Sequence, residues 1–413
     1  MKILFVHQNF PGQYKHLAAH FARNPKHQVV SIGERKDERQ VSLKGMRHLW
    51  YDKPKGANPT THLYLQGIEG AVRRGQAVVR TCLELRKGGF VPDVICAHPG
   101  WGEALYLKEV FPEAKLLNFY EFYYGARGSD LGFDPEFPTS FDDRFKVPTR
   151  NATHLLSLAS GDWGVSPTHW QREQFPPVWR AMISVVHDGI ETRLVKPDPR
   201  AVLKLEKQRL ELSRKDEVIT YVSRNLEPYR GFHIFMRALP EILKRRPRAT
   251  VLIIGGDEVS YGRKPTKGKT WREVMMAEVG GALDMSRVHF TGKVPYGQFL
   301  QLLQISSVHV YLTVPFVLSW SLLEAMAAGC LIVASGTQPV REAMDDGVNG
   351  LLVDFLSPAQ VAARVEEALV NQDRLQPLRE RARQTVVERY DLLSVCLPQQ
   401  LALIEWLAAR KAS

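Results

Sequence analysis

The sequence has little cysteine and lacks the spacings with which cysteine and histidine bind metals. Cys82, Cys96, Cys330 and Cys396 are the four cysteines among 413 residues, and they lie far apart. No Cys-x-x-Cys or Cys/His spacing accompanies them, so the pattern predicts neither a zinc site nor a disulfide framework. A chain of this kind fits a reducing compartment, and we expect a cytoplasmic protein.

Long apolar runs are also missing. No stretch approaches the roughly 20 uncharged residues that a helix needs to cross a bilayer. The N-terminal run KILFVH (2–7) is too short for a signal peptide, and charged sequence follows it at once. This run therefore predicts a first β-strand.

Acidic residues are outnumbered by basic ones, which gives a formal net charge of +11. Such a charge favours anionic partners: nucleotide phosphates, anionic lipid surfaces or nucleic acid. The basic residues have no interleaved aromatic ladder and match no recognition motif, so we expect no nucleic-acid partner. Peripheral contact with an anionic membrane, at the inner membrane face, is compatible with the charge.

Short apolar runs alternate along the chain with segments of helical spacing, and this alternation is typical of parallel βαβ sheets. The length suits two domains, and the polar segment KPDPR (196–200) marks the change between them. We predict an α/β fold of two Rossmann-like domains, with helices at 231–245, 271–283 and 319–328. The predicted strands are 2–7, 28–33, 93–98, 115–120, 164–166, 183–187, 218–223, 249–256, 287–292, 308–313, 331–335 and 350–355.

Ligands of such sheets bind at the carboxyl ends of the strands. After the first strand, Pro11 and Gly12 break the chain before a helix, and this loop is either a plain tight turn or a ligand loop that exposes helix amides. No GxGxxG pattern occurs, so no nicotinamide or flavin site is predicted. Two further strand ends carry His98 and Glu121. This pair could orient an acceptor hydroxyl or meet the positive charge of an oxocarbenium-like transition state, although a lone histidine at a strand end is often structural.

In the second half of the chain, a third candidate site is the segment VSRNLEPYRG, which follows a predicted strand. Ser223 and Arg224 end a strand, and Arg230 stands at the mouth of the next helix. Two guanidinium groups on such a loop can converge on a diphosphate, which they bind through forked, charge-assisted hydrogen bonds. The other interpretation is a solvated basic loop.

A fourth place is PFVLSWSLLEAMAAGC, where a helix begins near Ser319 to Ser321. Glu324 could accept hydrogen bonds from ribose hydroxyls while free helix amides hold phosphate oxygens. Ser321-Leu-Leu-Glu324 is equally a capping box, in which the glutamate only satisfies the amide of the cap residue. The spacing alone does not separate the two.

Taken together, these segments resemble the family 4 glycosyltransferases of the glycosyltransferase-B fold over nearly the whole chain. The matching pieces, in the family's order and spacing, are ISVVHDGIETRLVKP, SRNLEPYRG, RVHFTGKVP, LLEAMAAGCLIVAS and GVNGLLVD. The resemblance implies an N-terminal acceptor-binding domain over 1–196, a C-terminal nucleotide-sugar domain over 197–390, and a last helix, 391–413, that packs back on the N-terminal domain.

The resemblance also implies a retaining transfer of sugar from a nucleotide-diphosphate donor, a UDP- or GDP-sugar, without a metal or other cofactor. Arg224 and Arg230 match the phosphate-binding pair and Glu324 matches a ribose-binding glutamate. Lys293 and Val294, with Gly292, match the strand end that reads the base. The amides of Leu322 and Leu323, next to Ser321, would meet the phosphates. The expected acceptor is a sugar, a lipid-linked molecule or a polysaccharide.

Two features depart from the family pattern. Phe316 stands where family members often carry a second glutamate. The end of the strand at 115–120 reads Tyr120-Glu121 where the family often has histidine, and we expect the aromatic and acidic loop over 119–138 to shape the acceptor pocket. Alternative functions are a non-catalytic nucleotide-sugar-binding protein, a nucleotide-sugar epimerase, or a phosphorylase, for which no convincing pyridoxal lysine is present.

Overall fold

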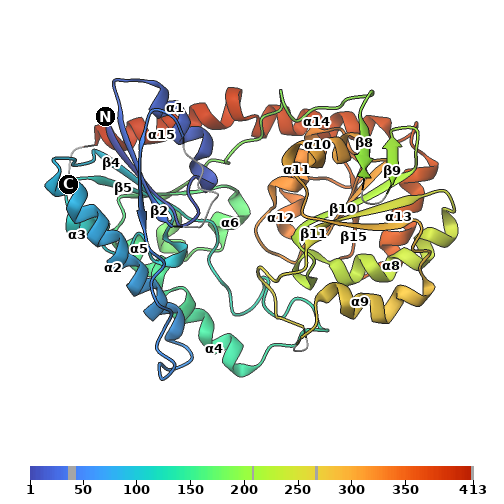
Figure 1. The fold of residues 1–413 in the computed structure, drawn as a ribbon, viewed down its shortest axis with the longest axis horizontal. Helices are drawn as coiled ribbons and strands as arrows, with labels where there is room; N and C mark the ends of the chain where they lie inside the picture. Colours follow the sequence, from blue (N-terminus) through green and yellow to red (C-terminus); the bar gives the residue numbers. More distant parts are fainter. Residues whose placement is uncertain (36–42, 207–208, 266–267, 411–413) are drawn as a thin grey trace. The chain divides into compact units, whose positions relative to one another are not determined.

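The computed structural model describes residues 1–35, 43–206, 209–265 and 268–410 (Figure 1). By their contacts the residues form two compact units. Unit 1 contains Met1–Gly132, Phe137–Gly189 and the chain from Leu393 on, and unit 2 contains Phe133–Glu136 and Ile190–Leu392. The chain thus passes between units at Gly189, seven residues before the boundary taken from the sequence, and the short segment 133–136 groups with unit 2.

Unit 1 contains a parallel sheet in the order β3-β2-β1-β4-β5-β6-β7. Its strands are β1 (Lys2–Val6), β2 (Gln28–Glu34), β3 (Arg47–Tyr51), β4 (Val94–Ala97), β5 (Lys115–Phe119), β6 (Trp163–Ser166) and β7 (Ile183–Val185). Its helices are α1 (Lys15–Arg23), α2 (Gln66–Lys87), α3 (Leu107–Val110), α4 (Phe141–Arg150), α5 (Ala152–Ser160), α6 (His169–Glu173), α7 (Pro177–Arg180) and α15 (Leu397–Ala409).

The continuous hydrophobicity of β1 follows from its position in the middle of this sheet. Ile3 and Phe5 point to one face, where α1 and α15 cover them, and Leu4 and Val6 point to the other, where α2 and α3 lie. All four side chains are fully buried, and each such burial contributes about 1.5–3 kcal/mol. A strand with two covered faces needs apolar residues at every position.

Unit 2 contains a second parallel sheet, in the order β12-β11-β10-β13-β14-β15, and an antiparallel hairpin of β8 and β9. Its strands are β8 (Val202–Leu205), β9 (Leu210–Ser213), β10 (Val218–Asn225), β11 (Thr250–Gly256), β12 (Val288–Gly292), β13 (Val308–Tyr311), β14 (Ile332–Ser335) and β15 (Leu351–Val353). Its helices are α8 (Phe232–Arg245), α9 (Trp271–Val279), α10 (Tyr296–Ile305), α11 (Trp320–Ala327), α12 (Gln338–Arg341), α13 (Pro358–Val370) and α14 (Gln376–Tyr390).

Every strand and helix predicted from the sequence is present, which confirms two Rossmann-like α/β sheets. β3, β8 and β9 were not predicted. In each large sheet the strand order reverses direction once, between β1 and β4 in unit 1 and between β10 and β13 in unit 2. Loops on either side of such a reversal diverge and leave a crevice, which is where ligands of this architecture bind.

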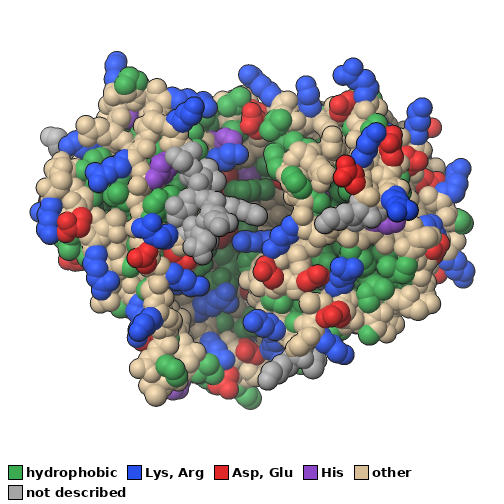
Figure 2. Space-filling model, in the orientation of Figure 1, with side chains coloured by type: hydrophobic (Ala, Val, Ile, Leu, Met, Phe, Trp, Pro, Cys, Tyr) green, Lys and Arg blue, Asp and Glu red, His purple; other side chains and the backbone are tan. Residues whose placement is uncertain are grey.

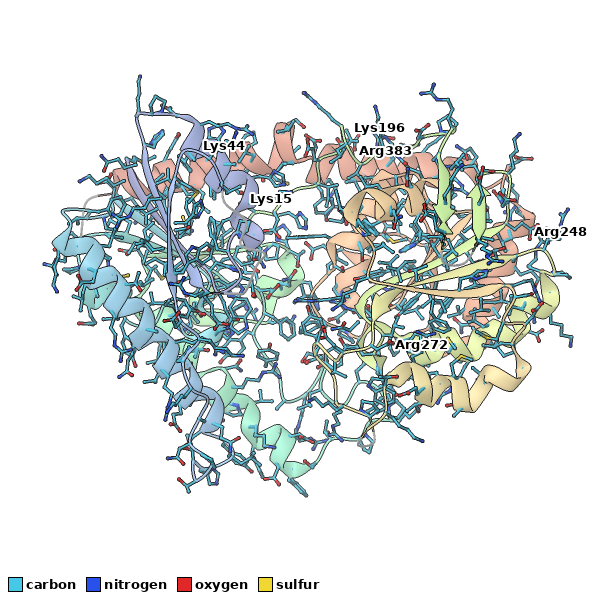
Figure 3. All side chains as sticks on the ribbon, in the orientation of Figure 1. Lys15, Lys44, Lys196, Arg248, Arg272 and Arg383 are labelled. Carbon is cyan, nitrogen blue, oxygen red and sulfur yellow. The ribbon has the colours of Figure 1, made fainter. Side chains whose placement is uncertain are left out.

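Two arginines of α14 anchor the helix that follows the reversal in unit 2. Arg383, labelled in Figure 3, donates hydrogen bonds to the carbonyls of Ala327 at 2.5 Å and Val195 at 3.1 Å. Arg379 donates to the carbonyl of Gly329 at 3.1 Å. Cations at these carbonyls satisfy the C-terminal end of α11 and complement its dipole. The N-terminal end of α11 is therefore positioned through the arginine contacts at its C-terminal end.

The C-terminal helix packs in unit 1, where Ile404 and Leu407 are buried beside α1, β4 and β5. The last three residues of the segment predicted as this helix, 411–413, lie outside the described residues. Within the described chain, the helical stretch 392–409 is long and apolar enough, by length and composition, to cross a membrane. The sequence expectation of no such stretch is wrong on that measure, although core helices pass the same test.

Candidate active site

Arg230 lies at the reversal point of the sheet in unit 2. It ends the short 3-10 helix that follows β10, and Gly231 then starts α8 with φ of +66°. The guanidinium Nη1 donates hydrogen bonds to Thr313 Oγ1 at 2.9 Å and to the carbonyl of Val317 at 3.0 Å. Both partners follow β13, the neighbour of β10 across the reversal. The fold therefore joins two loops that are far apart in sequence through one arginine.

Aromatic rings surround this guanidinium. Its Cζ lies 5.5 Å from the ring centre of Tyr261 and 5.7 Å from that of Phe316, and Arg230 is buried. It forms no ion pair with any residue that the structure describes. A buried cation without a carboxylate partner costs free energy, and an anionic ligand would offset this cost. Phe316 stands in the place of the glutamate expected by resemblance. Burial acts to lower the pKa of Arg230, but the charges of Tyr311, Tyr261 and Glu227 outweigh it and raise the pKa.

Arg224 and Lys293 are exposed at the ends of β10 and β12 and flank one carboxylate. Lys293 Nζ lies 3.0 Å from Glu258 Oε2. The pKa of Glu258 is lowered, mainly by this hydrogen bond and the charge of Lys293, and further by the charge of Arg224. The hydroxyl of Ser223 donates to the carbonyl of Asn225 at 2.8 Å. Arg224 and Lys293 thus both lie near Glu258, whereas the hydroxyl of Ser223 is already hydrogen-bonded to a backbone carbonyl.

Glu324 does not close a capping box, so that alternative is wrong. The N-cap of α11 is Ser319, whose Oγ accepts a hydrogen bond from the amide of Ser321. Glu324 therefore lies in the second turn, and its Oε1 accepts a hydrogen bond of 2.7 Å from the hydroxyl of Tyr296. Tyr296 starts α10, two residues beyond Val294. The glutamate is thus tied to the strand end that the resemblance assigns to the base.

The two leucines at the start of α11 are fully buried. The side chains of Leu322 and Leu323 fill the core of unit 2, so only their backbone can meet a ligand. The amide of Leu322 donates to the carbonyl of Ser319 at 3.2 Å.

In unit 1 the structure brings His98 and Glu121 together. His98 Nδ1 accepts a hydrogen bond from the amide of Gly100, so the neutral ring carries its proton on Nε2. That nitrogen lies 3.5 Å from Glu121 Oε2. Trp101 stacks on the imidazole, with ring centres 4.3 Å apart. The ring of His98 is held between its neighbours, and its Nε2 makes no hydrogen bond within the described residues, although the partly exposed carboxylate of Glu121 lies beside it.

The loop after β1 belongs to the same cluster. Gly12 has φ of +47°, and a Cβ there would lie 2.5 Å from the ring of His7, so the glycine is required for packing. His7 Nε2 lies 2.8 Å from Gln13 Oε1, and Gln13 Nε2 donates to Glu121 Oε1 at 3.4 Å. His7 and Gln13 were missed from the sequence. Both residues could have been found from their position directly after β1. Since β1 and β4 are neighbours across the reversal, residues after β1 lie near His98, which follows β4.

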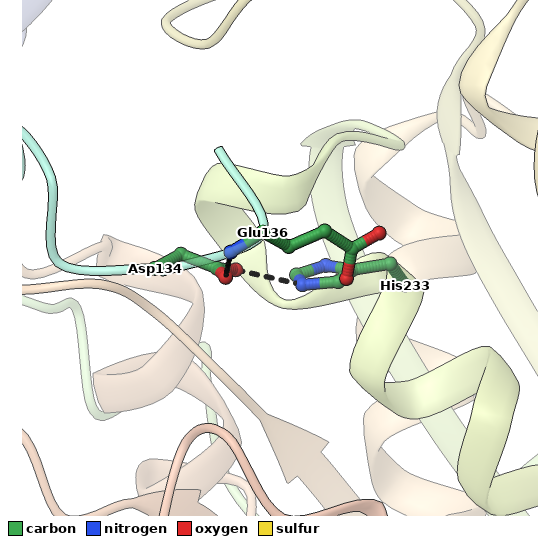
Figure 4. A group of neighbouring side chains, drawn as sticks. All are labelled: Asp134, Glu136 and His233. Carbon is green, nitrogen blue, oxygen red and sulfur yellow. Dashed lines mark hydrogen bonds and ion pairs between the residues drawn. The ribbon is translucent and has the colours of Figure 1, made fainter. Parts of the chain in front are cut away.

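One group among the described residues offers ligand atoms close enough to hold a metal ion: Asp134, Glu136 and His233 (Figure 4). Each of its acidic members is already paired. Asp134 Oδ2 lies 2.8 Å from His233 Nε2, and Glu136 accepts two hydrogen bonds from Arg237 at 2.6 and 2.9 Å. The group fastens residues 133–136 to α8, so this part of the loop expected to shape the acceptor pocket is bound to unit 2.

On the face drawn in Figure 2, basic side chains are spread rather than gathered in one field. Acidic side chains lie between them, and many pair with them, as in the ion pairs of Arg237 with Glu136 and Glu278. The positive net charge therefore does not by itself mark a binding face.

Two parallel α/β sheets with polar residues at their strand ends are typical of glycosyltransferases of the glycosyltransferase-B fold, and the comparisons agree. A model of the glycosyl transferase family 4 group matches residues 25–195, and a model of the glycosyl transferases group 1 matches residues 204–385. The chain belongs to the family 4, group 1 glycosyltransferases.

Curated relatives match about half of this chain. The D-inositol 3-phosphate glycosyltransferase of Acidothermus cellulolyticus is 28% identical over 219 residues, which are 51% of this chain and 46% of that protein. The phosphatidyl-myo-inositol mannosyltransferase of Mycobacterium tuberculosis is 28% identical over 210 residues, 48% of this chain and 50% of that one. The chain thus spans about half the length of the curated relatives it matches.

Solved structures match over the whole chain. HepE of Anabaena in complex with UDP and glucose has a TM-score of 0.68 at 17% identity. The match includes 99% of this chain and 100% of the HepE chain. Sucrose-phosphate synthase of Thermosynechococcus elongatus has a TM-score of 0.73 at 16% identity, with 99% and 100% covered. These likenesses confirm the predicted glycosyltransferase-B fold.

Proposed function

We propose that the protein is a retaining glycosyltransferase that moves a sugar from a UDP- or GDP-sugar to a hydroxyl acceptor, in polysaccharide or glycolipid synthesis. The observation that carries the proposal is the buried guanidinium of Arg230, which lies at the reversal of the sheet in unit 2 and forms no ion pair with a described residue. Two names support it: HepE was solved with UDP and glucose, and a relative is named for mannosyl transfer to phosphatidyl-myo-inositol.

The donor diphosphate binds Arg230 and Arg224 in this proposal, and Glu324 with Tyr296 holds the ribose. As the bond from the anomeric carbon to the diphosphate oxygen breaks, negative charge grows on that oxygen. A preorganised guanidinium stabilises this charge without reorganisation. Cations in the protein take the role that a metal has elsewhere, so we propose transfer without a metal cofactor.

The acceptor oxygen then forms its bond to the anomeric carbon on the face that the diphosphate leaves. Bond formation on that face retains the configuration, and the proton of the acceptor passes to the departing diphosphate oxygen, which balances the charge. In unit 1, His98 and Glu121 are proposed to orient the acceptor, because the carboxylate can accept a hydrogen bond from a hydroxyl. We propose a cytoplasmic location, in keeping with four buried cysteines that form no disulfide with one another.

The test is a panel of UDP-, GDP- and ADP-sugars, with binding read as a thermal shift and turnover as release of the nucleoside diphosphate. Arg224→Gln is expected to lower turnover roughly 100-fold, the order seen when one charged donor to a transition state is lost. Arg248→Gln is the matched control, because Arg248 is an exposed arginine of unit 2 away from the strand ends (Figure 3). Full turnover by Arg224→Gln, or no response to any nucleotide, contradicts the proposal.

A non-catalytic nucleotide-sugar-binding protein is the second candidate, and Phe316 in place of the family glutamate is the observation that favours it. In that case a nucleotide sugar binds, but no acceptor is glycosylated and no nucleoside diphosphate is released. A nucleotide-sugar epimerase would instead convert the bound sugar to its epimer without any acceptor. Mass and NMR analysis of the sugar after incubation separates all three.

A further inference from the structure

A cavity of about 400 Å³ lies in unit 1 beside the pair His98 and Glu121. Its walls come from the start of α2, the loops after β4 and β5, and the helices α4 and α5. Arg74, Lys146, Arg150 and His154 line it together with aromatic side chains that include Trp101 and Tyr124, and no acidic residue is among its described lining. An apolar wall with several cations and no acid is suited to an organic anion.

Two of the cations are free to meet a ligand. Lys146 and Arg150 are four residues apart on α4, so they lie on the same face of the helix. Neither forms an ion pair with any other residue in the described ranges. The guanidinium of Arg150 is fixed 3.5 Å above the ring centre of Tyr124. Arg74 is the exception, since its Nε lies 3.5 Å from Glu34.

The imidazole of His154 supplies an independent observation. The residue is 4% exposed, and its Nδ1 has no hydrogen-bond partner within the described part of the chain. A buried polar atom without a partner is destabilising, and such atoms often mark a missing ligand. Burial, and then the charges of His98 and Arg150, lower the pKa of His154 to about 3. The ring is therefore neutral near pH 7 and has one N–H to donate.

We propose that this cavity binds a phosphate group carried by the acceptor, an inference that rests on the proposed glycosyl transfer. Two free cations and a buried imidazole match the charge and the oxygens of a phosphate monoester. Trp101 lines the cavity and also stacks on His98. A polyol or sugar attached to the phosphate would therefore extend along Trp101 toward Glu121, where the reacting hydroxyl is oriented.

The test uses the full chain without any nucleotide. Binding of inorganic phosphate and of sn-glycerol 3-phosphate is measured by calorimetry, with glycerol and chloride at matched ionic strength as blanks. The wild-type protein is expected to bind both phosphates saturably. Lys146→Met and Arg150→Gln are each expected to weaken binding roughly ten-fold or more, as for loss of one charge-assisted hydrogen bond.

Arg144→Gln is the matched control, because Arg144 is an exposed arginine of the same helix that does not line the cavity. Retained phosphate binding by this variant and by Arg224→Gln is expected. The absence of saturable binding by the wild type overturns the proposal, as does equal weakening in Arg144→Gln. Loss of phosphate binding in Arg224→Gln also overturns it, because the anion would then occupy the donor site. Nucleotide-induced thermal shifts verify that Lys146→Met and Arg150→Gln are folded.

This readout is independent of the donor. Phosphate binding without consumption of any nucleotide sugar rejects the proposed function alone, whereas sugar transfer without phosphate binding rejects this inference alone. The phosphate can belong to a soluble acceptor or to a lipid headgroup, and Phe141 and Phe145 are exposed on the same helix, α4. Recruitment to phosphatidylcholine vesicles that contain phosphatidic acid, lost in Phe145→Ser while glycerol 3-phosphate still binds, identifies a lipid source. Glycerol 3-phosphate binding without recruitment identifies a soluble one.

Discussion

The substitution Arg230→Met tests the buried guanidinium that the proposed donor site depends on. Methionine keeps much of the length and apolar stem of arginine but removes the charge and its donors. In the structure those donors meet Thr313 and the carbonyl of Val317 at 2.9 and 3.0 Å. A hydrogen bond from a charged group contributes about 1.5–3 kcal/mol. Loss of one such bond to a diphosphate should therefore weaken nucleotide binding about 10- to 100-fold.

The effect is large enough for a thermal assay with UDP or GDP. At a nucleotide concentration of roughly 100 times the dissociation constant, binding stabilises the wild-type fold by about 2.7 kcal/mol. A variant that binds 100-fold more weakly keeps about 0.4 kcal/mol at that concentration. In a domain of roughly 200 residues each kcal/mol shifts the melting temperature by about 2–4 °C. The expected shift thus falls from about 5–10 °C to about 1–2 °C.

Two further variants make the result interpretable. Arg230→Lys keeps the charge, so we expect it to retain part of the nucleotide-induced shift. Arg245→Met removes an arginine at the far end of α8, where the guanidinium pairs with Glu241 and Glu366, and should keep the full shift. An undiminished shift in Arg230→Met, measured on protein that melts cooperatively without nucleotide, would refute the reasoning. So would an equal loss in Arg245→Met.

Three other predictions concern single positions. Glu324→Gln is expected to remove most of the preference for UDP over 2′-deoxy-UDP, seen by calorimetry, since the carboxylate is proposed to bind the ribose; an unchanged preference argues against that role. Burial lowers the pKa of His309 to about 3, against roughly 6.5 when unfolded. Between these two pKa values the unfolded chain binds more protons than the folded chain. The free energy of unfolding should therefore fall as the pH drops from about 7 to 4. Urea titrations should show a less steep fall for His309→Gln. Gly231→Ala should destabilise by more than Gly347→Ala: both have positive φ, but only at Gly231 would a Cβ lie 2.4 Å from Leu312 Cβ, and equal melting temperatures would contradict this.

The fold was predictable because its strands are buried on both faces and read as continuous apolar runs. β3 lies at the edge of the sheet and has the sequence RHLWY, in which two polar residues precede only three large ones, so it gave no such run. The hairpin of β8 and β9 was missed for a similar reason. Only one face of it is covered, as the alternating burial of β8 indicates. Periodicity identifies strands in the middle of a sheet better than those with one free face.

The candidate site was predictable as a set of strand ends but not as a set of contacts. Arg224 and Arg230 could be selected because they follow a buried strand, whereas Glu324 was selected by its place near a helix start and by family resemblance. The bond from Tyr296 to Glu324 could not, because the residues are 28 positions apart and meet only when α10 and α11 pack. The predicted helix start near Ser319 to Ser321 is confirmed, but the sequence could not choose between the two serines as caps, because both are good caps and the choice depends on the path of the chain out of β13.

The replacement of the family's glutamate by Phe316 has a physical consequence at the donor site. The ring centre of Phe316 lies 5.7 Å from Arg230 Cζ, and a carboxylate on a side chain at this position would reduce the local positive charge before any ligand binds. Phenylalanine adds no such charge, so the charge of Arg230 is offset only by groups already near it, such as Glu227. If the donor site is the one proposed, this position gives up a contact to the sugar and keeps more positive charge for the phosphates. We therefore predict that the protein discriminates among nucleotide donors by their diphosphate and ribose more than by their sugar.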